Sequence, residues 1–181
     1  MDTRLTFSQT VETLFTRGMG PALPPEAKAR LRDDGLDLDR PLLPAYPAGK
    51  VAEWIDLALP YAFPNLSRAE ALRVLGHQSV SRYGQTIVGR GLVAMLKLLG
   101  FRRILDRMPQ AMRTGGNYLE TKLIPRGVND VELWINDVNG MPEYFQGILE
   151  GTAELCGIKT ARAEIVSVEG TGCTLRVRWA E

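Results

Sequence analysis

The sequence predicts an α+β fold in which a helical N-terminal half packs on a four-stranded antiparallel sheet. Apolar residues recur every three or four positions through residues 1–110, which is the period of helices with one buried face. In residues 111–181 they alternate with polar residues on either side of one helical stretch, which predicts the order strand-strand-helix-strand-strand. A chain of 181 residues with 45% hydrophobic and 24% charged residues fits a single globular domain, residues 1–181.

Two short helices are expected first. The stretch FSQTVETLF predicts an opening helix with Ser8 or Thr10 as N-cap, ended by Gly18. The stretch PPEAKARLRDDG predicts a second helix, with proline at its entry and Gly35 at its exit. The following segment, LDLDRPLLPAYPAG, is predicted to be irregular, because each of its three prolines disfavours helical geometry in the residue before it. A helix then resumes with an apolar stripe made of Val51, Trp54, Ile55 and Leu59.

A long helical region is expected from Ser67 to Leu99. Ser67 precedes Glu70 by three residues, which is the spacing of a capping box. Glycines interrupt the apolar pattern, so we expect two helices that meet near Gly89. The stretch FRRILDRM predicts one or two further turns, ended by Pro109.

The sheet half begins with two alternating segments, NYLETKLI and VELWIND. The residues between them, PRGVND, have the composition of a turn and predict an antiparallel hairpin. PEYFQGILEGTAELCG predicts the helix that follows, and two more strands are expected around the turn at residues 169–172. Leu175, Val177 and Trp179 are expected to face one way and Arg176 and Arg178 the other.

The charge is unevenly distributed along the chain. Residues 73–113 contain eight basic residues and one acidic residue, a balance of +7 that leaves −6 for the rest of a chain with net charge +1. This basic segment is either a solvated helix surface or a face that attracts nucleic acid, an anionic membrane or an acidic protein. We do not expect nucleic-acid binding, because no known motif accompanies the charge.

The longest apolar run contains Lys97 and is shorter than the roughly 20 residues that cross a bilayer. The N-terminus carries Asp2 and no apolar signal core, and two cysteines are too few for a disulfide framework. We therefore expect a cytoplasmic protein that does not associate with membranes. Cys156 and Cys173 are expected to be reduced core thiols.

No pattern in the sequence predicts a catalytic or metal site. The single histidine, His77, lies in no nucleophile motif, and a zinc site would lack ligands at a recognisable spacing. GRGLVA, at residues 89–94, matches a dinucleotide fingerprint, but no strand introduces it. Glu120 and Glu132 could face each other across the hairpin, as polar residues of a solvent face do. We therefore expect no metal, no cofactor and a non-enzymatic protein.

The stretch MRTGGNYLET, at residues 112–121, joins the last helix to the first strand. Gly115 and Gly116 permit positive φ angles, so the stretch is predicted to be a structural corner. Backbone N–H groups in such a bend can also hold an anion, with Arg113 assisting.

Three stretches carry a resemblance to a known family: GRGLVAMLKLLGFRRILDRMPQAMRTGGNYLETKL, VELWINDVNGMPEYFQGILEGTAELCG and LRVRW. Together they resemble a large myxobacterial paralogous family of unknown function, over most of the chain. The resemblance implies a cytoplasmic single-domain bacterial protein with many sibling copies, and it brings no reaction, cofactor or catalytic residue.

The order of elements is similar to that of heme-nitric-oxide-binding domains and vinyl-reductase-like (V4R) domains, an analogy of fold that does not fix function. A heme needs an axial ligand, and His77 lies in the middle of the helical region rather than beside the sheet, so heme is not expected.

Two functional hypotheses follow. The first is a ligand-binding, sensory or regulatory domain with a small-molecule pocket between the helical half and the sheet, where the candidate ligand-binding residues are Tyr83, Arg113, Asn117, Tyr118, Trp134 and Tyr144. Trp54 is a further candidate lining residue. The alternative is a protein-interaction adaptor without a pocket, which meets an acidic protein or a second copy of itself through the basic segment 73–113 or a sheet edge.

Overall fold

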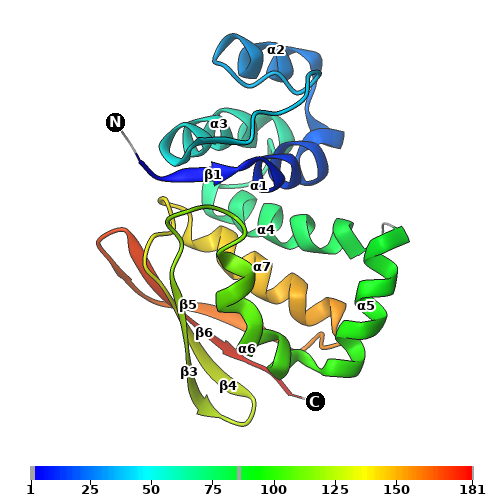
Figure 1. Ribbon diagram of the computed structural model, residues 1–181, viewed down its shortest axis with the longest axis vertical. Coiled ribbons are helices and arrows are strands. Elements are labelled where there is room, and N and C mark those ends of the chain that lie inside the picture. The colour runs from blue at the N-terminus through cyan, green and yellow to red at the C-terminus, as the bar shows by residue number, and fades with distance from the viewer. Residues whose placement is uncertain (1–2, 85–86, 181) are drawn as a thin grey trace.

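The computed structural model describes residues 3–84 and 87–180, without the side chains of residues 83–90 and 92. It has the α+β architecture that the sequence predicts. Helices occupy the N-terminal part of the chain and pack on an antiparallel sheet with strand order β3-β4-β6-β5, and helix α7 connects β4 to β5 (Figure 1).

The N-terminal region contains a small second sheet that the sequence analysis missed. Its elements are β1 (Leu5–Phe7), α1 (Ser8–Glu12), a π-helical turn (Thr13–Gly18), a 3-10 turn (Gly20–Ala22), α2 (Pro25–Asp33), β2 (Ala45–Pro47) and α3 (Ala48–Ala62). Strand β2 lies in the proline-rich segment predicted to be irregular, and it pairs antiparallel with β1. Pro47 is tolerated within β2 because β2 is an edge strand, and Pro41 and Pro44 precede it.

The opening helix begins at Ser8, with Phe7 as its N-cap, so the predicted Ser8 or Thr10 cap is wrong. The start of this helix is set by contacts with distant parts of the chain. Residues before Ser8 belong to β1, and the Ser8 N–H donates to the carbonyl of Pro44 at 3.0 Å.

Three helices follow: α4 (Arg68–Gly84), α5 (Ile87–Leu99) and α6 (Phe101–Met112). The capping box at the start of α4 is confirmed, because the Ser67 N–H and hydroxyl donate to Glu70 at 2.9 and 2.6 Å. The break between α4 and α5 precedes Gly89, which lies inside α5. Helix α6 continues through Pro109 rather than ending there, because burial of Met112 beyond the proline holds the last turn in place.

The sheet contains β3 (Thr121–Gly127), β4 (Asp130–Ile135), β5 (Arg162–Glu169) and β6 (Gly172–Arg178), with α7 (Pro142–Leu155) inserted after β4. The first hairpin turn is shorter than predicted, because Gly127 already pairs with Asp130. Strand β3 also begins later than predicted. The Asn136 side chain accepts from the Glu120 N–H at 2.7 Å and donates to the Tyr118 carbonyl at 2.8 Å, which holds the chain before Thr121 outside the regular ladder.

One face of the sheet forms the core. Its buried side chains are Val131, Leu133, Ile135, Cys173, Leu175 and Val177. Helix α7 covers them with Phe145, Leu149 and Ala153, and α6 adds Phe101, whose ring meets that of Trp179 edge-on at 5.0 Å. The alternation read from the sequence therefore predicted the buried face correctly.

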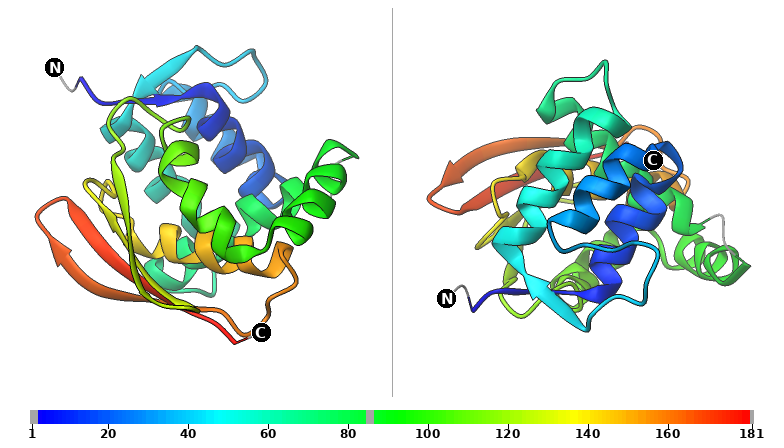
Figure 2. Two further views of the ribbon diagram at one scale, coloured as in Figure 1. Left: turned by 60° about the horizontal axis from the view of Figure 1, so that its bottom comes forward. Right: turned by 90° about the horizontal axis from the view of Figure 1, so that it is seen from above.

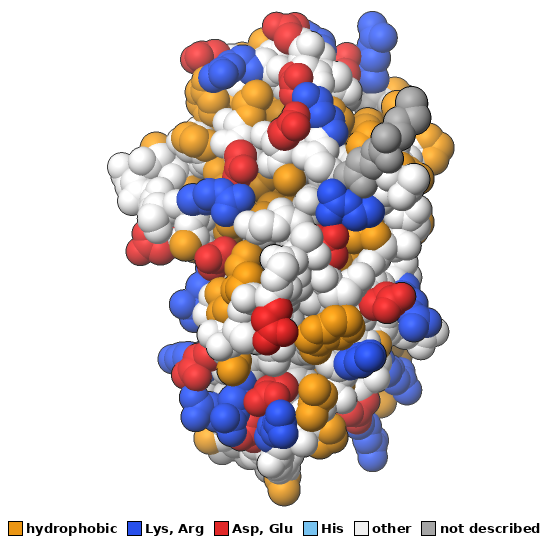
Figure 3. Space-filling model, turned by 90° about the vertical axis from the view of Figure 1, so that its left-hand side faces the viewer, with side chains coloured by type: hydrophobic (Ala, Val, Ile, Leu, Met, Phe, Trp, Pro, Cys, Tyr) orange, Lys and Arg blue, Asp and Glu red, His pale blue; other side chains and the backbone are white. Residues whose placement is uncertain are grey.

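The opposite face of the sheet is mainly polar, although the strands also expose Ile124, Val166 and Val168. Ion pairs at 2.6 Å join neighbouring strands, namely Arg126–Glu132, Arg176–Asp130 and Arg178–Glu164. The view in Figure 3 shows both signs of charge mixed over this side of the molecule. None of the described helices is both long enough and apolar enough to cross a membrane.

Candidate functional site

Helices α4 and α7 cross with their backbones in contact. A Cβ atom on Gly147 would lie 1.9 Å from the Arg73 carbonyl oxygen, and one on Gly76 would lie 2.0 Å from the Tyr144 carbonyl oxygen. Real Cβ contacts are never this short, so only glycine fits at either position. The side chains beside the crossing are therefore held at fixed separations.

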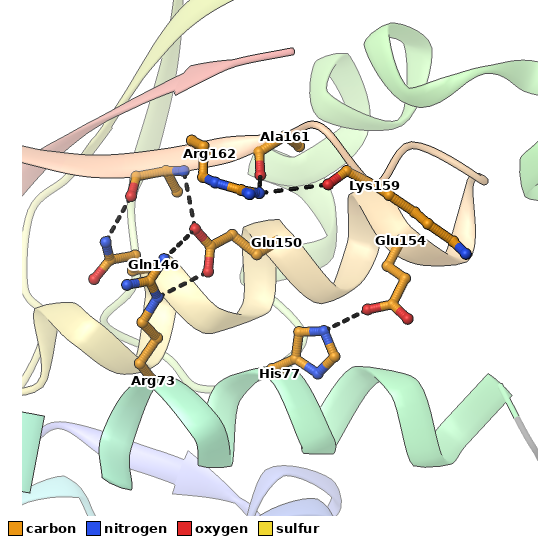
Figure 4. A network of polar contacts seen from close by, with 9 residues as sticks. Arg73, His77, Gln146, Glu150, Glu154, Lys159, Ala161 and Arg162 are labelled. Carbon is orange, nitrogen blue, oxygen red and sulfur yellow. Dashed lines mark hydrogen bonds and ion pairs between the residues drawn. The ribbon is translucent and has the colours of Figure 1, made fainter. Parts of the chain in front are cut away.

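Two ion pairs flank the crossing on its solvent side (Figure 4). The Arg73 guanidinium donates from Nε and Nη2 to the two carboxylate oxygens of Glu150 at 2.8 and 2.6 Å, and this pairing raises the pKa of Arg73. His77 Nε2 lies 2.7 Å from Glu154 Oε2. In both pairs the α4 side chain meets an α7 carboxylate, so neither Arg73 nor His77 lacks a partner.

Glu150 also connects α7 to the edge of the sheet. Its Oε1 accepts from the Ala163 N–H at 3.2 Å, and Gln146 Nε2 donates to the Ala163 carbonyl at 2.5 Å (Figure 4). Strand β5 is the sheet edge, and these side chains satisfy both outward-facing backbone groups of Ala163. At this residue the edge cannot accept another strand.

A cleft of about 340 Å³ opens beside these contacts. Its lining residues come from α4, α7 and the chain entering β5, and they are Arg73, His77, Glu150, Glu154, Ile158, Lys159, Ala161 and Arg162. Arg162 Nη1 donates to the carbonyl of Ala161 at 2.8 Å, a neutral partner. Neither Lys159 nor Arg162 forms an ion pair within the described part of the chain, so the cleft contains two cations without a carboxylate partner.

A second hollow of about 280 Å³ lies between α3 and α4. It is mainly apolar, with Asp56, Leu59, Pro60, Phe63, Pro64, Leu66, Arg68 and Ala71 in its wall. Its two charged residues pair with each other, Arg68 Nε to Asp56 Oδ1 at 2.8 Å. It therefore offers no uncompensated charge to a ligand.

The corner at residues 112–121 serves a structural purpose in this fold. Asn117 Oδ1 accepts from the Leu5 N–H at 2.7 Å, and its Nδ2 donates to the Thr3 carbonyl at 3.1 Å. The Phe7 N–H donates to the Gly115 carbonyl at 3.0 Å. The corner thus holds β1, while Arg113 is exposed at the end of α6.

The aromatic candidates are dispersed. Trp134 lies on the polar face of the sheet, with the Lys122 ammonium 5.1 Å from its ring centroid. Tyr144 is buried, and burial raises its pKa to about 12, with a further contribution from nearby Tyr118. Only Tyr118 and Tyr144 are thus brought together, and the side chain of Tyr83 lies outside the described residues.

Trp54 is not in either hollow. It is 2% exposed, and its Nε1 donates to the Asp34 carboxylate at 2.9 Å.

The sequence analysis did not identify the residues that line the cleft. Their signal was a pair of matched spacings, since Arg73 and His77 are four residues apart on one helix, as are Glu150 and Glu154 on another.

The described residues contain no group of three or more histidine, cysteine, aspartate or glutamate side chains that could hold a metal ion. Both cysteines are free, and Cys173 is buried as predicted, whereas Cys156 is only partly buried. Burial raises the pKa of each thiol to about 11, which favours the neutral form at physiological pH.

Several solved structures share this fold over nearly the whole chain. One is a protein solved to study how porphyrin distortion modulates heme redox potential, with a TM-score of 0.71, 15% identity and coverage of 96% of this chain and 99% of that chain. A mutant Cs H-NOX protein matches with a TM-score of 0.71 and 14% identity, over 97% of this chain and 97% of that chain. An oxygen-binding H-NOX domain related to soluble guanylate cyclases matches with a TM-score of 0.65 and 15% identity, over 96% of this chain and 90% of that chain. At these identities the likeness concerns the fold alone.

The residues described here do not fit a heme. His77 lies at the surface against Glu154, both thiols favour the neutral form, and Tyr144 is buried with a raised pKa. These four side chains therefore offer no axial ligand for a heme.

No curated protein sequence matches the chain. The family described as "Protein of unknown function (DUF2378)" matches residues 4–180, which is almost the entire sequence. The chain therefore belongs to the DUF2378 family and has an H-NOX-like fold.

Proposed function

We propose that this protein is a non-enzymatic sensory or regulatory domain that binds a small anionic molecule in the cleft between α4, α7 and β5. The observation that carries the proposal is that Lys159 and Arg162 line the cleft without a carboxylate partner among the described residues, whereas Arg73 is paired with Glu150. Two cations at the same cleft can both reach one anionic ligand.

The geometry restricts the ligand in size and charge. A cleft of about 340 Å³ is near the lower end of the range for small-molecule sites, about 300–1,000 Å³. A guanidinium and an ammonium bind carboxylate or phosphate groups through charge-assisted hydrogen bonds, which are about twice as strong as neutral ones. A compact carboxylate or phosphate compound fits both restrictions.

The site favours binding over reaction. Its lining residues include no serine, threonine or cysteine that His77 could activate as a nucleophile. The fold is also that of H-NOX domains, one of which binds oxygen, and this likeness supports a sensory role by analogy.

Isothermal titration calorimetry tests the proposal with acetate, succinate and inorganic phosphate, against neutral glycerol and cationic choline. We expect at least one of the anions to bind and the neutral and cationic compounds not to bind. Lys159→Gln should weaken anion binding by about tenfold or more, the value of one charge-assisted hydrogen bond.

Lys122→Gln is the matched control, because it removes one lysine from the polar face of the sheet, where the ammonium lies over Trp134. It should leave the affinity unchanged. Failure of every anion to bind, or equal losses in both variants, would contradict the proposed site.

A further inference from the structure

Helix α5 projects from the body of the molecule, as both views in Figure 2 show. Its described residues on one face are all exposed, and they recur at helical spacing: Gly91, Ala94, Met95 and Leu98. Leu98 is 87% exposed and Met95 is 49% exposed. We call this row the α5 stripe. Large apolar side chains at such exposure on one helix face indicate a surface that meets something apolar.

Three exposed cations lie on α5 and on the helix that follows it. Lys97 is exposed on its flank, and Arg103 and Arg107 are exposed on α6, which follows after Gly100 alone. None of these three has an ion-pair partner within the described residues. The acidic residue of α6, Asp106, lies 3.6 Å from Arg102. The neighbourhood of the stripe is therefore positively charged.

We propose that α5 and the first turns of α6 dock on an anionic lipid bilayer surface, with the α5 stripe at the acyl boundary and the three cations at the headgroups. An apolar face flanked by lysine and arginine is the pattern of interfacial helices. A second copy of the chain fits poorly, because pairing two such faces would bring like charges together. An acidic protein would need a groove to receive a projecting convex helix, which a fluid bilayer does not need.

This docking is independent of the anion cleft. It also revises the expectation from the sequence that the protein does not associate with membranes. That expectation was based on the lack of a spanning segment, and surface binding requires none.

Co-sedimentation with vesicles tests the proposal. The probes are phosphatidylcholine vesicles with and without phosphatidylglycerol, at low and at high salt. We expect the intact protein to sediment with the anionic vesicles only and to be released by salt. Leu98→Glu, and separately Arg103→Glu with Arg107→Glu, should each weaken binding by about tenfold or more.

The controls match these changes in exposure and charge. Val128→Glu places the same charge on an apolar residue that is 85% exposed at the β3–β4 turn. Arg32→Glu with Arg40→Glu reverses two exposed arginines in the N-terminal region. Both controls should sediment like the wild type. Absence of sedimentation with anionic vesicles, equal losses in test and control variants, or a wild-type dimer that Leu98→Glu dissociates would overturn the proposal.

Discussion

The α4–α7 crossing and helix α5 are opposite solutions to helix packing within one chain. At the crossing, glycines let two backbones touch, and ion pairs on the solvent side connect the same two helices. Helix α5 is far more apolar, yet it leaves Leu98 almost fully exposed. In the described part of α5, apolar side chains are thus left at the surface, whereas the α4–α7 contact is tight enough to admit only glycine.

The difference assigns different properties to the two regions. Side chains at the crossing are fixed by backbone contact, so the cleft beside it is pre-organised, and a ligand there needs little ordering of the protein. The α5 stripe has no such support and gains contacts only from a partner. The first region suits selective recognition of a small molecule, and the second suits attachment to a surface.

Gly147→Ala should give the largest effect, because it places a methyl group 1.9 Å from the Arg73 carbonyl oxygen, where neither backbone can give way locally. We expect a loss of about 3 kcal/mol or more in the free energy of unfolding. Thermal unfolding followed by circular dichroism should show a decrease in Tm of about 6–12 °C.

Gly91→Ala is the matched control in α5, because no atom lies within 4 Å of the position its Cβ would take. Here alanine should increase stability by about 0.5–1 kcal/mol, through its higher helix propensity. Similar destabilisation by both variants would mean that the crossing is not the tight contact described above.

Glu150→Gln should have the second largest effect. It keeps the shape of the side chain but removes the charge that Arg73 pairs with and weakens acceptance from the Ala163 N–H. Because Arg73 is about half exposed, we expect the free energy of unfolding, measured with urea, to fall by only about 1–2 kcal/mol. A variant as stable as the wild type would show that this ion pair does not fasten α4 to α7.

Glu154→Gln makes the same change one helical turn further along. The side chains of both partners are more than one third exposed, 53% for Glu154 and 36% for His77. Water screens such a pair, and we expect a change of about 0.5 kcal/mol or less at neutral pH, again from urea unfolding. A loss equal to that of Glu150→Gln would refute the distinction drawn between the two pairs.

Glu70, in the first turn of α4, makes the stability of this helix depend on pH. The first turn of α5 contains no acidic residue and lacks this dependence. The hydrogen bonds from the Ser67 side chain and backbone lower the pKa of Glu70 in the folded protein. Its contribution is therefore present above the unfolded pKa of about 4.3 and is lost as pH falls through the lower folded value. The difference in Tm between wild type and Glu70→Gln should shrink over this range, and a constant difference would contradict the assignment.

Local patterns predicted most of the fold. Alternation in VELWIND identified the buried face of β4, and the Ser67–Glu70 spacing identified the start of α4. The errors arose where distant contacts override local preference. Strand β2 exists because β1 pairs with it from about forty residues away in sequence, and α6 continues past Pro109 because Met112 is buried beyond it.

The cleft could not be predicted in the same way. Arg73 and Glu150 are 77 residues apart, as are His77 and Glu154, and nothing local indicates that their helices cross. The aromatic residues chosen as lining candidates turned out to be dispersed, because large amphipathic side chains also serve as ordinary core or sheet residues, as Tyr144 and Trp134 do here. Matched i, i+4 spacings on two helices were the available signal.

The central claim is that the cleft recognises anions through Lys159 and Arg162. The most direct measurement is the change in backbone amide resonances of isotope-labelled protein as succinate, phosphate and acetate are added in turn. The account predicts saturable shifts clustered at residues 73–77, 150–154 and 158–162, which disappear in Lys159→Gln. Shifts that cluster between α5 and α6 instead, or that persist unchanged in the variant, would contradict it.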